Sequence, residues 1–184
     1  MINTMDMIVG SAKIYVGDFS ANYKKPNALI ASLGAENEFG LCKDGVKIKS
    51  EANIAEYDFN GKNDKTVKEM QEILGYTVEI EGELIDINET FLSMSGFKKE
   101  TIEETGDYKI YNPSALNDTD YKDIVIVGRL LGKDTVCAIL CKNCYNSNGI
   151  EFDTKDKENA GAKFKFNSCY SIEDMDATPI SIIM

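Results

Sequence analysis

The stretch Tyr76-Thr-Val-Glu-Ile-Glu-Gly82 decides the fold class. Val78 and Ile80 alternate with threonine and glutamate, so one face of this segment is apolar and the other is polar. A period of two predicts a β-strand that covers a core with one face and meets solvent with the other. Gly82 predicts a bulge or bend before a further extended segment at Glu83–Ile87.

The same alternation recurs along most of the chain, with turn-forming residues between the extended segments. Strands are predicted at Ala12–Gly17, Gly45–Ser50, Ala52–Phe59, Lys122–Val127, Thr135–Leu140 and Ala162–Tyr170. Turns are predicted at Lys43–Gly45, Asn60-Gly61, Leu131–Asp134 and Asn146–Gly149. The chain is therefore expected to be mainly β, as one domain over residues 1–184: a β-sandwich or barrel with long extended loops or arms.

One short helix is expected to pack on this sheet. Asn88 has the character of an N-cap, Phe91 to Met94 supply apolar positions, and Gly96 ends the segment. Thr66–Leu74 is ambiguous, because Val67 and Met70 fit one face of a helix while the segment also fits an extended strand. Local propensity favours a helix there.

Composition excludes several classes of function. The 184 residues carry 20 Lys plus Arg against 31 Asp plus Glu, a net charge of −11, which argues against nucleic acid gripped by a basic surface. The absence of histidine removes His-based triads, bases and metal ligands. We expect no enzymatic activity and no cofactor, because glycine-rich phosphate loops and nucleophile motifs are also absent. Met1–Gly10 lacks the features of a secretory signal, and no stretch is long enough to span a membrane.

Five cysteines predict reduced cytosolic thiols. The spacing Cys137-x3-Cys141-x2-Cys144 matches the three-thiolate pattern of some iron–sulfur clusters, and Cys169 could complete a zinc site instead. However, Thr135–Lys142 has the alternation of a strand, and cysteine is often a buried apolar residue. Core or interface packing is therefore the favoured interpretation.

Taken in order, the motifs resemble the tail tube (major tail) proteins of tailed bacteriophages. The similarity runs from Gly10 to the end of the chain. Its main pieces are Gly10–Gly17, Gly45–Ile48, Thr66–Met70, Tyr76–Ile87, Tyr121–Arg129, Gly132–Asn143, Ala162–Tyr170, Glu173–Asp176 and Pro179-Ile180. The resemblance implies that Thr66–Leu74 is a strand or loop, against the local helix prediction.

The resemblance also implies a structural role in the virion tail, with the protein made in the cytoplasm of a bacterial host. Subunits would form hexameric rings, whose sheets join into one inner barrel, and the rings would stack into a tube that conducts DNA without binding it specifically. An N-terminal arm at about residues 1–10 and a long loop would reach neighbouring copies. Further partners would be tape-measure, tail-tip or baseplate and terminator proteins, and a sheath if the tail is contractile.

In such a tube the polar side of the strongest strand would line an acidic lumen that repels phosphate, with Glu79, Glu81 and Glu83 as candidates. The alternative places these glutamates on an outer, solvated face. Apolar candidates for contacts between subunits are Ile8, Val9, Tyr57, Phe59, Val67, Met70, Ile182 and Ile183.

Two further hypotheses remain open beside the iron–sulfur or zinc protein. The same fold could build the tube of a phage-derived bacteriocin or contractile injection particle, which carries no DNA. A different class is a monomeric β-barrel that binds a small ligand, which predicts a pocket inside the barrel.

Overall fold

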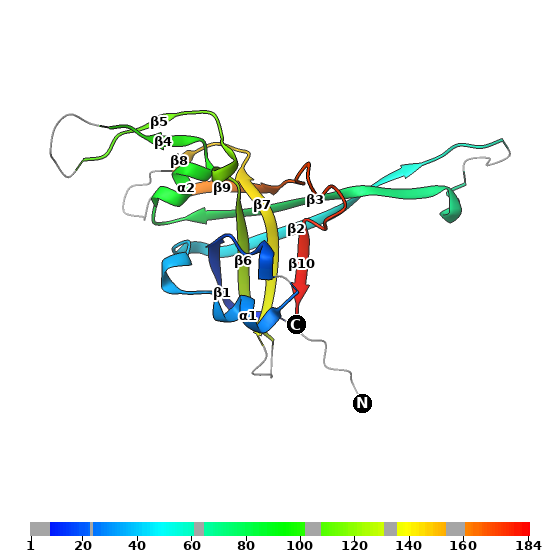
Figure 1. The fold of residues 1–184 in the computed structure, drawn as a ribbon, viewed down its shortest axis with the longest axis horizontal. Helices are drawn as coiled ribbons and strands as arrows, with labels where there is room; N and C mark the ends of the chain where they lie inside the picture. The colour runs from blue at the N-terminus through cyan, green and yellow to red at the C-terminus, as the bar shows by residue number, and fades with distance from the viewer. Residues whose placement is uncertain (1–7, 23, 61–64, 102–107, 131–135, 154–160) are drawn as a thin grey trace.

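The computed structural model describes residues 8–22, 24–60, 65–101, 108–130, 136–153 and 161–184. Within them the regular structure is mainly antiparallel strand, in an eight-stranded sheet of order β1-β6-β7-β9-β3-β2 with β10 on β7 and β8 on β9, and a separate two-stranded sheet, β4-β5. The strands are β1 Ile8–Gly17, β2 Cys42–Glu56, β3 Gln71–Leu84, β4 Phe97–Lys99, β5 Tyr111–Pro113, β6 Lys122–Leu130, β7 Val136–Asn146, β8 Glu151–Asp153, β9 Gly161–Ser168 and β10 Ile180–Ile183. The expected mainly β architecture is confirmed (Figure 1).

Two short α-helices and four 3₁₀ turns accompany the strands in these ranges. They are α1 Pro26–Ala31, α2 Glu89–Met94, η1 Ser20–Asn22, η2 Ala35–Asn37, η3 Lys68–Met70 and η4 Asp118–Asp120. Helix α2 is the predicted one: the Asn88 side chain accepts a 2.8 Å hydrogen bond from the Phe91 N–H, and Gly96 ends the segment at φ +76°. Helix α1 was not predicted, although Pro26 stands at its start, where the fixed proline φ suits a helix.

The sheet bends around β7. One edge of β7 pairs with β6, while its other edge pairs with β10 beside 138–141 and with β9 beside 144–146. Side chains from both halves of the sheet therefore meet in one core, where Ile14 and Ile124 join Ile80 and Phe166. Burial of these alternating side chains is the main force that holds the body together.

Four phenylalanines fill the space between the two halves of the sheet. Phe39 has edge-to-face contacts with Phe91, Phe164 and Phe166, with ring centroids 5.5 to 6.3 Å apart. The ring of Phe164 lies where a side chain at Gly82 would be, since a Cβ there would approach it to 2.6 Å. The glycine makes room for a ring, and the bulge predicted there is not on β3 itself: β3 stays in register with β9 through Gly82, while its register with β2 shifts beside it.

The irregularity lies on the neighbouring strand instead. The register between β2 and β3 shifts between Lys43 and Val46, where Gly45 has φ +85°. The predicted turn at Lys43–Gly45 is thus a bulge within β2, which the positive φ of glycine permits.

A second, smaller core covers the outer face of β6 and β7. Val125, Ala138 and Leu140 are buried there under Leu29 of α1 and Phe19. The segment between β1 and β2, which contains α1, thus closes this face of the sheet (Figure 1).

The helix prediction at Thr66–Leu74 is wrong. Only a 3₁₀ turn forms at Lys68–Met70, and β3 begins at Gln71, as the strand-or-loop alternative had it. Pairing with β2 overrides local propensity here, beginning with the Tyr57 N–H that donates to the Met70 carbonyl at 2.9 Å.

Some predictions fall partly outside the described residues. These are the N-terminal arm before Ile8, the turn at Gly61 and the link at 131–135. Residues 8–10, which were included in the predicted arm, belong to β1, and Ile8 and Val9 pair with β6. In the part of the chain that is described, no helix has the length and apolar character needed to cross a membrane.

Candidate functional site

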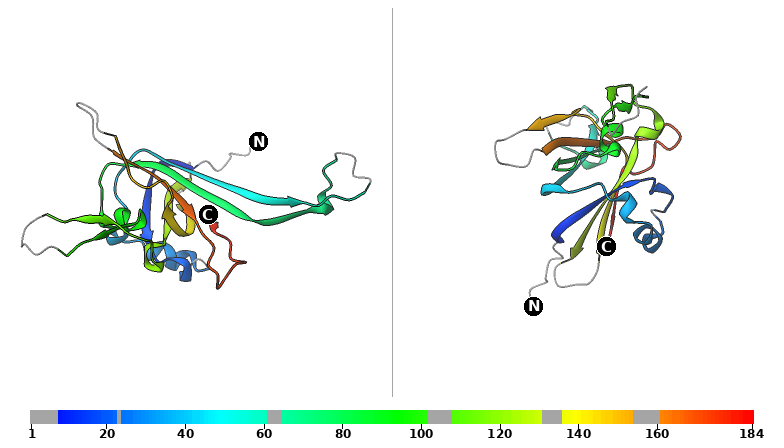
Figure 2. Two further views of the ribbon diagram at one scale, coloured as in Figure 1. Left: turned by 90° about the horizontal axis from the view of Figure 1, so that it is seen from above. Right: turned by 90° about the vertical axis from the view of Figure 1, so that its left-hand side faces the viewer.

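Strands β2 and β3 leave the body together as a long two-stranded arm (Figures 1 and 2). The β2–β3 arm comprises the described residues 51–60 and 65–77, and it starts where the pairing of β3 with β9 ends, at Glu79 opposite Asn167. Beyond that point each strand of the arm has the other as its partner. The arm is thus the part of β2 and β3 that pairs with no third described strand.

The apolar stripe that faces the core continues onto the arm. Cross-strand pairs on this side run from Ile48–Ile80 through Ala52–Tyr76 to Ile54–Ile73. Ile80 is buried, whereas Ile54 and Ile73 are each 54% exposed. The arm therefore presents in solvent the same surface that the body buries, which is the arrangement expected of a face that a partner covers.

A bulge and a tyrosine mark the junction between arm and body. Asn53 pairs with Gly75 but Ile54 pairs with Ile73, so Leu74 is an extra residue on β3. The Tyr170 hydroxyl accepts a 2.7 Å hydrogen bond from the Tyr76 N–H, which caps the free edge of β3. Gly75 allows this approach, because a Cβ there would lie 3.1 Å from the Tyr170 oxygen. Such bulges turn a strand and increase its twist, so this one helps to aim the arm.

The predicted contact residues on the arm lie on its surface. Tyr57 and Phe59 are exposed, and Val67 and Met70 are half-buried around the 3₁₀ turn η3. The Tyr57 hydroxyl donates a 2.7 Å hydrogen bond to Glu72, and this bond raises the pKa of Tyr57 above its ordinary value. The four residues are therefore brought together on one projecting element.

The other predicted contact residues lie on β1 and β10. Ile182 is exposed, but Ile183 is half-buried and packs against the second core of its own chain. Ile8 and Val9 pair through their backbones with Leu130 and Arg129 of β6. Ile183 therefore has less surface left for a contact between subunits than Ile182, and its role in such a contact stays a prediction.

The three candidate lumen glutamates lie together on the polar face of β3. Each is paired with lysine from a neighbouring strand: Lys165 lies 2.9 Å from Glu79, Lys47 lies 3.3 Å from Glu81, and Lys43 lies 3.7 Å from Glu83. The hydrogen bond from Lys47, followed by that from Lys165, lowers the pKa of Glu81, so this carboxylate stays ionised at neutral pH. Sequence alone located these glutamates on one face but did not find their lysine partners.

Cross-strand register extends this pattern into a lattice that we call the charged face. Its described ionic side chains come from β2, β3, β8 and β9: Lys43, Lys47, Lys49, Glu51, Glu79, Glu81, Glu83, Glu151, Lys163 and Lys165. Lys163 is paired with Glu151 at 2.7 Å and Lys49 with Glu51 at 2.9 Å. Lysine and glutamate therefore balance across this surface.

Four of the five cysteines lie in strands, whereas Cys169 follows β9 and is half-buried. Cys141 and Cys144 are buried in the main core, and burial raises the pKa of Cys141 to about 12. In the described ranges, no three Cys, Asp or Glu side chains converge in an arrangement that could hold a metal ion. The geometry thus supports apolar packing of Cys137, Cys141 and Cys144.

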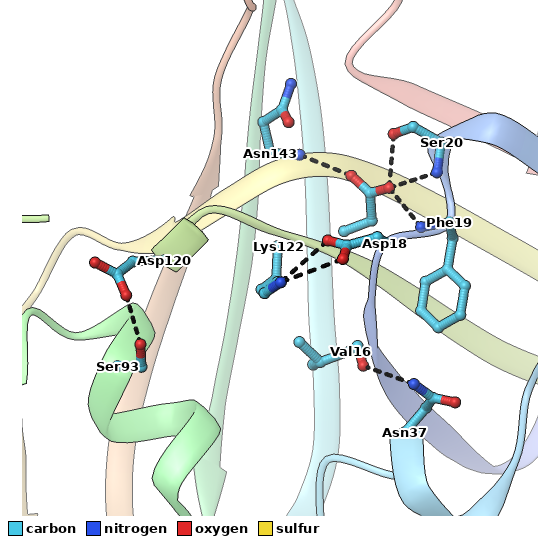
Figure 3. Close-up of polar contacts among 10 residues, drawn as sticks. Val16, Asp18, Phe19, Ser20, Asn37, Ser93, Asp120, Lys122 and Asn143 are labelled. Atoms are coloured by element: carbon cyan, nitrogen blue, oxygen red, sulfur yellow. Dashed lines mark hydrogen bonds and ion pairs between the residues drawn. The ribbon is translucent and has the colours of Figure 1, made fainter. Parts of the chain in front are cut away.

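A buried carboxylate that sequence analysis missed joins the segment after β1 to the central strands (Figure 3). Asp123 accepts hydrogen bonds from the Phe19 N–H at 2.8 Å, from the N–H and hydroxyl of Ser20 at 2.6 Å, and from the Asn143 N–H at 3.1 Å. Its position was informative, because Asp123 is in phase with the apolar residues Val125 and Val127. Such a carboxylate positions the backbone rather than a ligand.

The hollows on the described surface are shallow and lie outside the core. A groove of about 580 Å³ runs between the segment after β9 and the end of β7, with Tyr121, Asn143 and Tyr170 among its lining residues. The interior of the bent sheet, where a barrel would hold a ligand, is filled by phenylalanine rings. This packing disfavours a barrel with an internal ligand pocket.

Comparison with known proteins identifies no relative of this chain. No protein-family model matches the chain, and a search of curated proteins finds no significant match.

Proposed function

We propose that this chain is a structural, non-enzymatic subunit that polymerises with copies of itself into a hollow tube of stacked hexameric rings. The β2–β3 arm is the observation that carries the proposal. A two-stranded ribbon that extends from the body and exposes apolar side chains on its core-side face is costly in a protein that stays alone. In a polymer, a neighbouring copy buries that face.

The sheet also has edges suited to pairing between copies. Among the described strands, β2 pairs with β3 and β1 pairs with β6, which leaves an outer backbone edge at each end of the sheet. Part of the β1 edge is covered, because the Phe39 N–H donates to the Ile14 carbonyl at 2.8 Å. Joined sheets would close the ring, and the arm would then contact the next copy or the next ring.

The kind of particle to which the tube belongs is proposed from the resemblance to phage tail tube proteins. The tube would stand in a virion tail, contractile or non-contractile, and DNA would pass through it during ejection. Tape-measure, tail-tip or baseplate, terminator and sheath proteins would be its partners. A bacteriocin or injection particle would use the same subunit contacts without DNA, so the arm supports both particles equally.

Electron microscopy of the purified, concentrated protein tests the proposal. We expect rings or hollow tubes, whose abundance rises sharply above a critical concentration. The variant Ile54→Thr/Ile73→Thr removes the exposed stripe but keeps β-branched side chains. If each isoleucine buries its side chain in the polymer, the critical concentration should rise by about tenfold or more.

Ile87→Thr/Ile110→Thr is the matched control. It makes the same two substitutions at exposed isoleucines just before α2 and just before β5, which lie away from the arm. We expect this control to polymerise like the unaltered protein. Compact monomers of the unaltered protein at every concentration would contradict the proposal, and equal losses in both variants would contradict the role of the arm.

A further inference from the structure

We propose that the charged face is an electrically neutral wall for double-stranded DNA: its glutamates prevent its lysines from binding the phosphate backbone. This inference rests on the proposed function, in which the polar side of β3 lines the tube. It differs from the acidic lumen expected from the sequence, because the wall would neither trap DNA nor strongly repel it. Glu79 and Glu81 would pair with Lys47 and Lys165 and so keep phosphate groups from binding these lysines.

The lattice has regular rows set by strand register. Lys49, Glu79 and Asn167 form one row, and Lys47, Glu81 and Lys165 form the next. A third row contains Lys43, Glu83, Lys163 and Glu151. Neighbours within a row point to the same side of the sheet, so each glutamate of β3 is within reach of lysines on both flanking strands.

Charge is distributed unevenly between this face and the rest of the chain. The described side chains of the charged face comprise five lysines and five glutamates, so they sum to zero. The whole chain carries −11, so the excess negative charge lies elsewhere. A polyanion that approaches the charged face would therefore meet less repulsion than the net charge of the whole chain implies.

The central pairs explain why this face does not become a DNA site. Lys165 lies 2.9 Å from Glu79 and 3.4 Å from Glu81, and Glu81 is also 3.3 Å from Lys47. The hydrogen bond with Glu79 is the main cause that raises the pKa of Lys165. This lysine therefore stays charged, but it is already paired. A phosphate would have to displace a fixed carboxylate to reach it, which removes most of the gain from neutralising a phosphate.

The test is DNA binding by the soluble protein at low ionic strength, measured by fluorescence anisotropy of a short labelled duplex. We expect no binding by the unaltered protein. Glu79→Gln/Glu81→Gln leaves Lys47 and Lys165 without these partners, and the face gains two positive charges. Affinity should rise at least about tenfold, with a log–log salt slope of about −2 for two phosphate contacts.

Two controls make the result specific. Glu173→Gln/Asp176→Asn gives the same change in net charge in the exposed segment between β9 and β10 and should leave binding absent. Adding Lys47→Gln/Lys165→Gln to the glutamate variant should abolish the gained binding. Circular dichroism confirms that each variant is folded.

Three outcomes would overturn the inference: DNA binding by the unaltered protein, no binding by folded Glu79→Gln/Glu81→Gln, or equal gains in the control. The assay needs no polymer, whereas electron microscopy of the same preparations reports polymerisation. Tubes without gained DNA binding would reject the neutral wall alone. Gained binding without tubes would reject the tube and leave the electrostatic inference standing.

Discussion

Strands β2 and β3 run through both the body and the arm, and the same apolar side is buried in one and exposed in the other. Comparing the two regions separates strand formation from burial in a core. In the body, Val78 and Ile80 are fully covered by β6, β9 and the phenylalanine cluster. On the arm, Ile54 and Ile73 continue the same apolar side and remain more than half exposed. Alternation and pairing continue through both regions, so the two regions differ in what packs on the apolar side, which in the body is the rest of the main core.

This difference predicts unequal costs for similar substitutions. In the body, each apolar side chain contributes transfer and packing energy to folding. On the arm, the same side chain contributes little to the isolated chain, and its contribution belongs to the assembled state. Measurements of folding and of assembly should therefore separate the two regions.

The largest effect is expected from Phe166→Ala, which opens a cavity where β9 meets Phe39 and Phe91. We expect the free energy of unfolding to fall by about 3–5 kcal/mol, as measured by urea denaturation. Phe152→Ala is the control, because this ring on β8 is 55% exposed and its loss should change stability by less than about 0.5 kcal/mol. Equal losses would contradict the description of the core.

The next effect concerns the attachment of the segment after β1. Asp123→Asn removes the charge that accepts hydrogen bonds from the Phe19, Ser20 and Asn143 N–H groups, and it adds a donor that faces other donors. We expect a loss of about 2–3 kcal/mol in urea denaturation. Asp18→Asn breaks a solvated pair with Lys122 nearby and should cost less than about 1 kcal/mol. A larger loss for the control would contradict the assigned role.

An element of this fold could be predicted from the sequence when the residues that determine it lie close to it in the chain. Helix α2 was predictable because its cap, Asn88, and its stop, Gly96, are local in sequence. The strand at Tyr76–Gly82 was predictable for the same reason. The segment at 66–74 was not, because its extended form depends on pairing with β2, which local propensity does not contain.

The candidate site shows the same division. The common face of Glu79, Glu81 and Glu83 followed from alternation in one strand. Their lysine partners could not be found that way, since the bulge at Asp44-Gly45 shifts the register and decides which β2 residue lies opposite Glu83. The need for glycine at position 82 likewise comes from the ring of Phe164, which is distant in sequence.

A smaller effect is expected at the boundary between body and arm. Tyr170→Phe removes the hydroxyl that accepts from the Tyr76 N–H at 2.7 Å, and we expect a loss of about 1 kcal/mol. Hydrogen exchange at the Tyr76 amide should accelerate, because that N–H then has no acceptor on Tyr170. Tyr57→Phe is the control: its hydroxyl bonds Glu72 within the exposed arm, so the Tyr76 amide should exchange as before. Unchanged exchange in Tyr170→Phe would show that the boundary lies elsewhere.

The smallest effect on folding should come from Ile54→Thr/Ile73→Thr on the arm. Both positions keep a β-branched side chain and lose little burial, so urea denaturation of the monomer should change by less than about 0.5 kcal/mol. The same variant should raise the critical concentration for polymerisation by about tenfold or more, so its effect falls on assembly whereas that of Phe166→Ala falls on folding. A large loss of monomer stability would mean that the stripe already packs on its own chain, and the distinction between body and arm would then fail. Unchanged stability together with impaired polymerisation would locate the contribution of these isoleucines in the contact between copies.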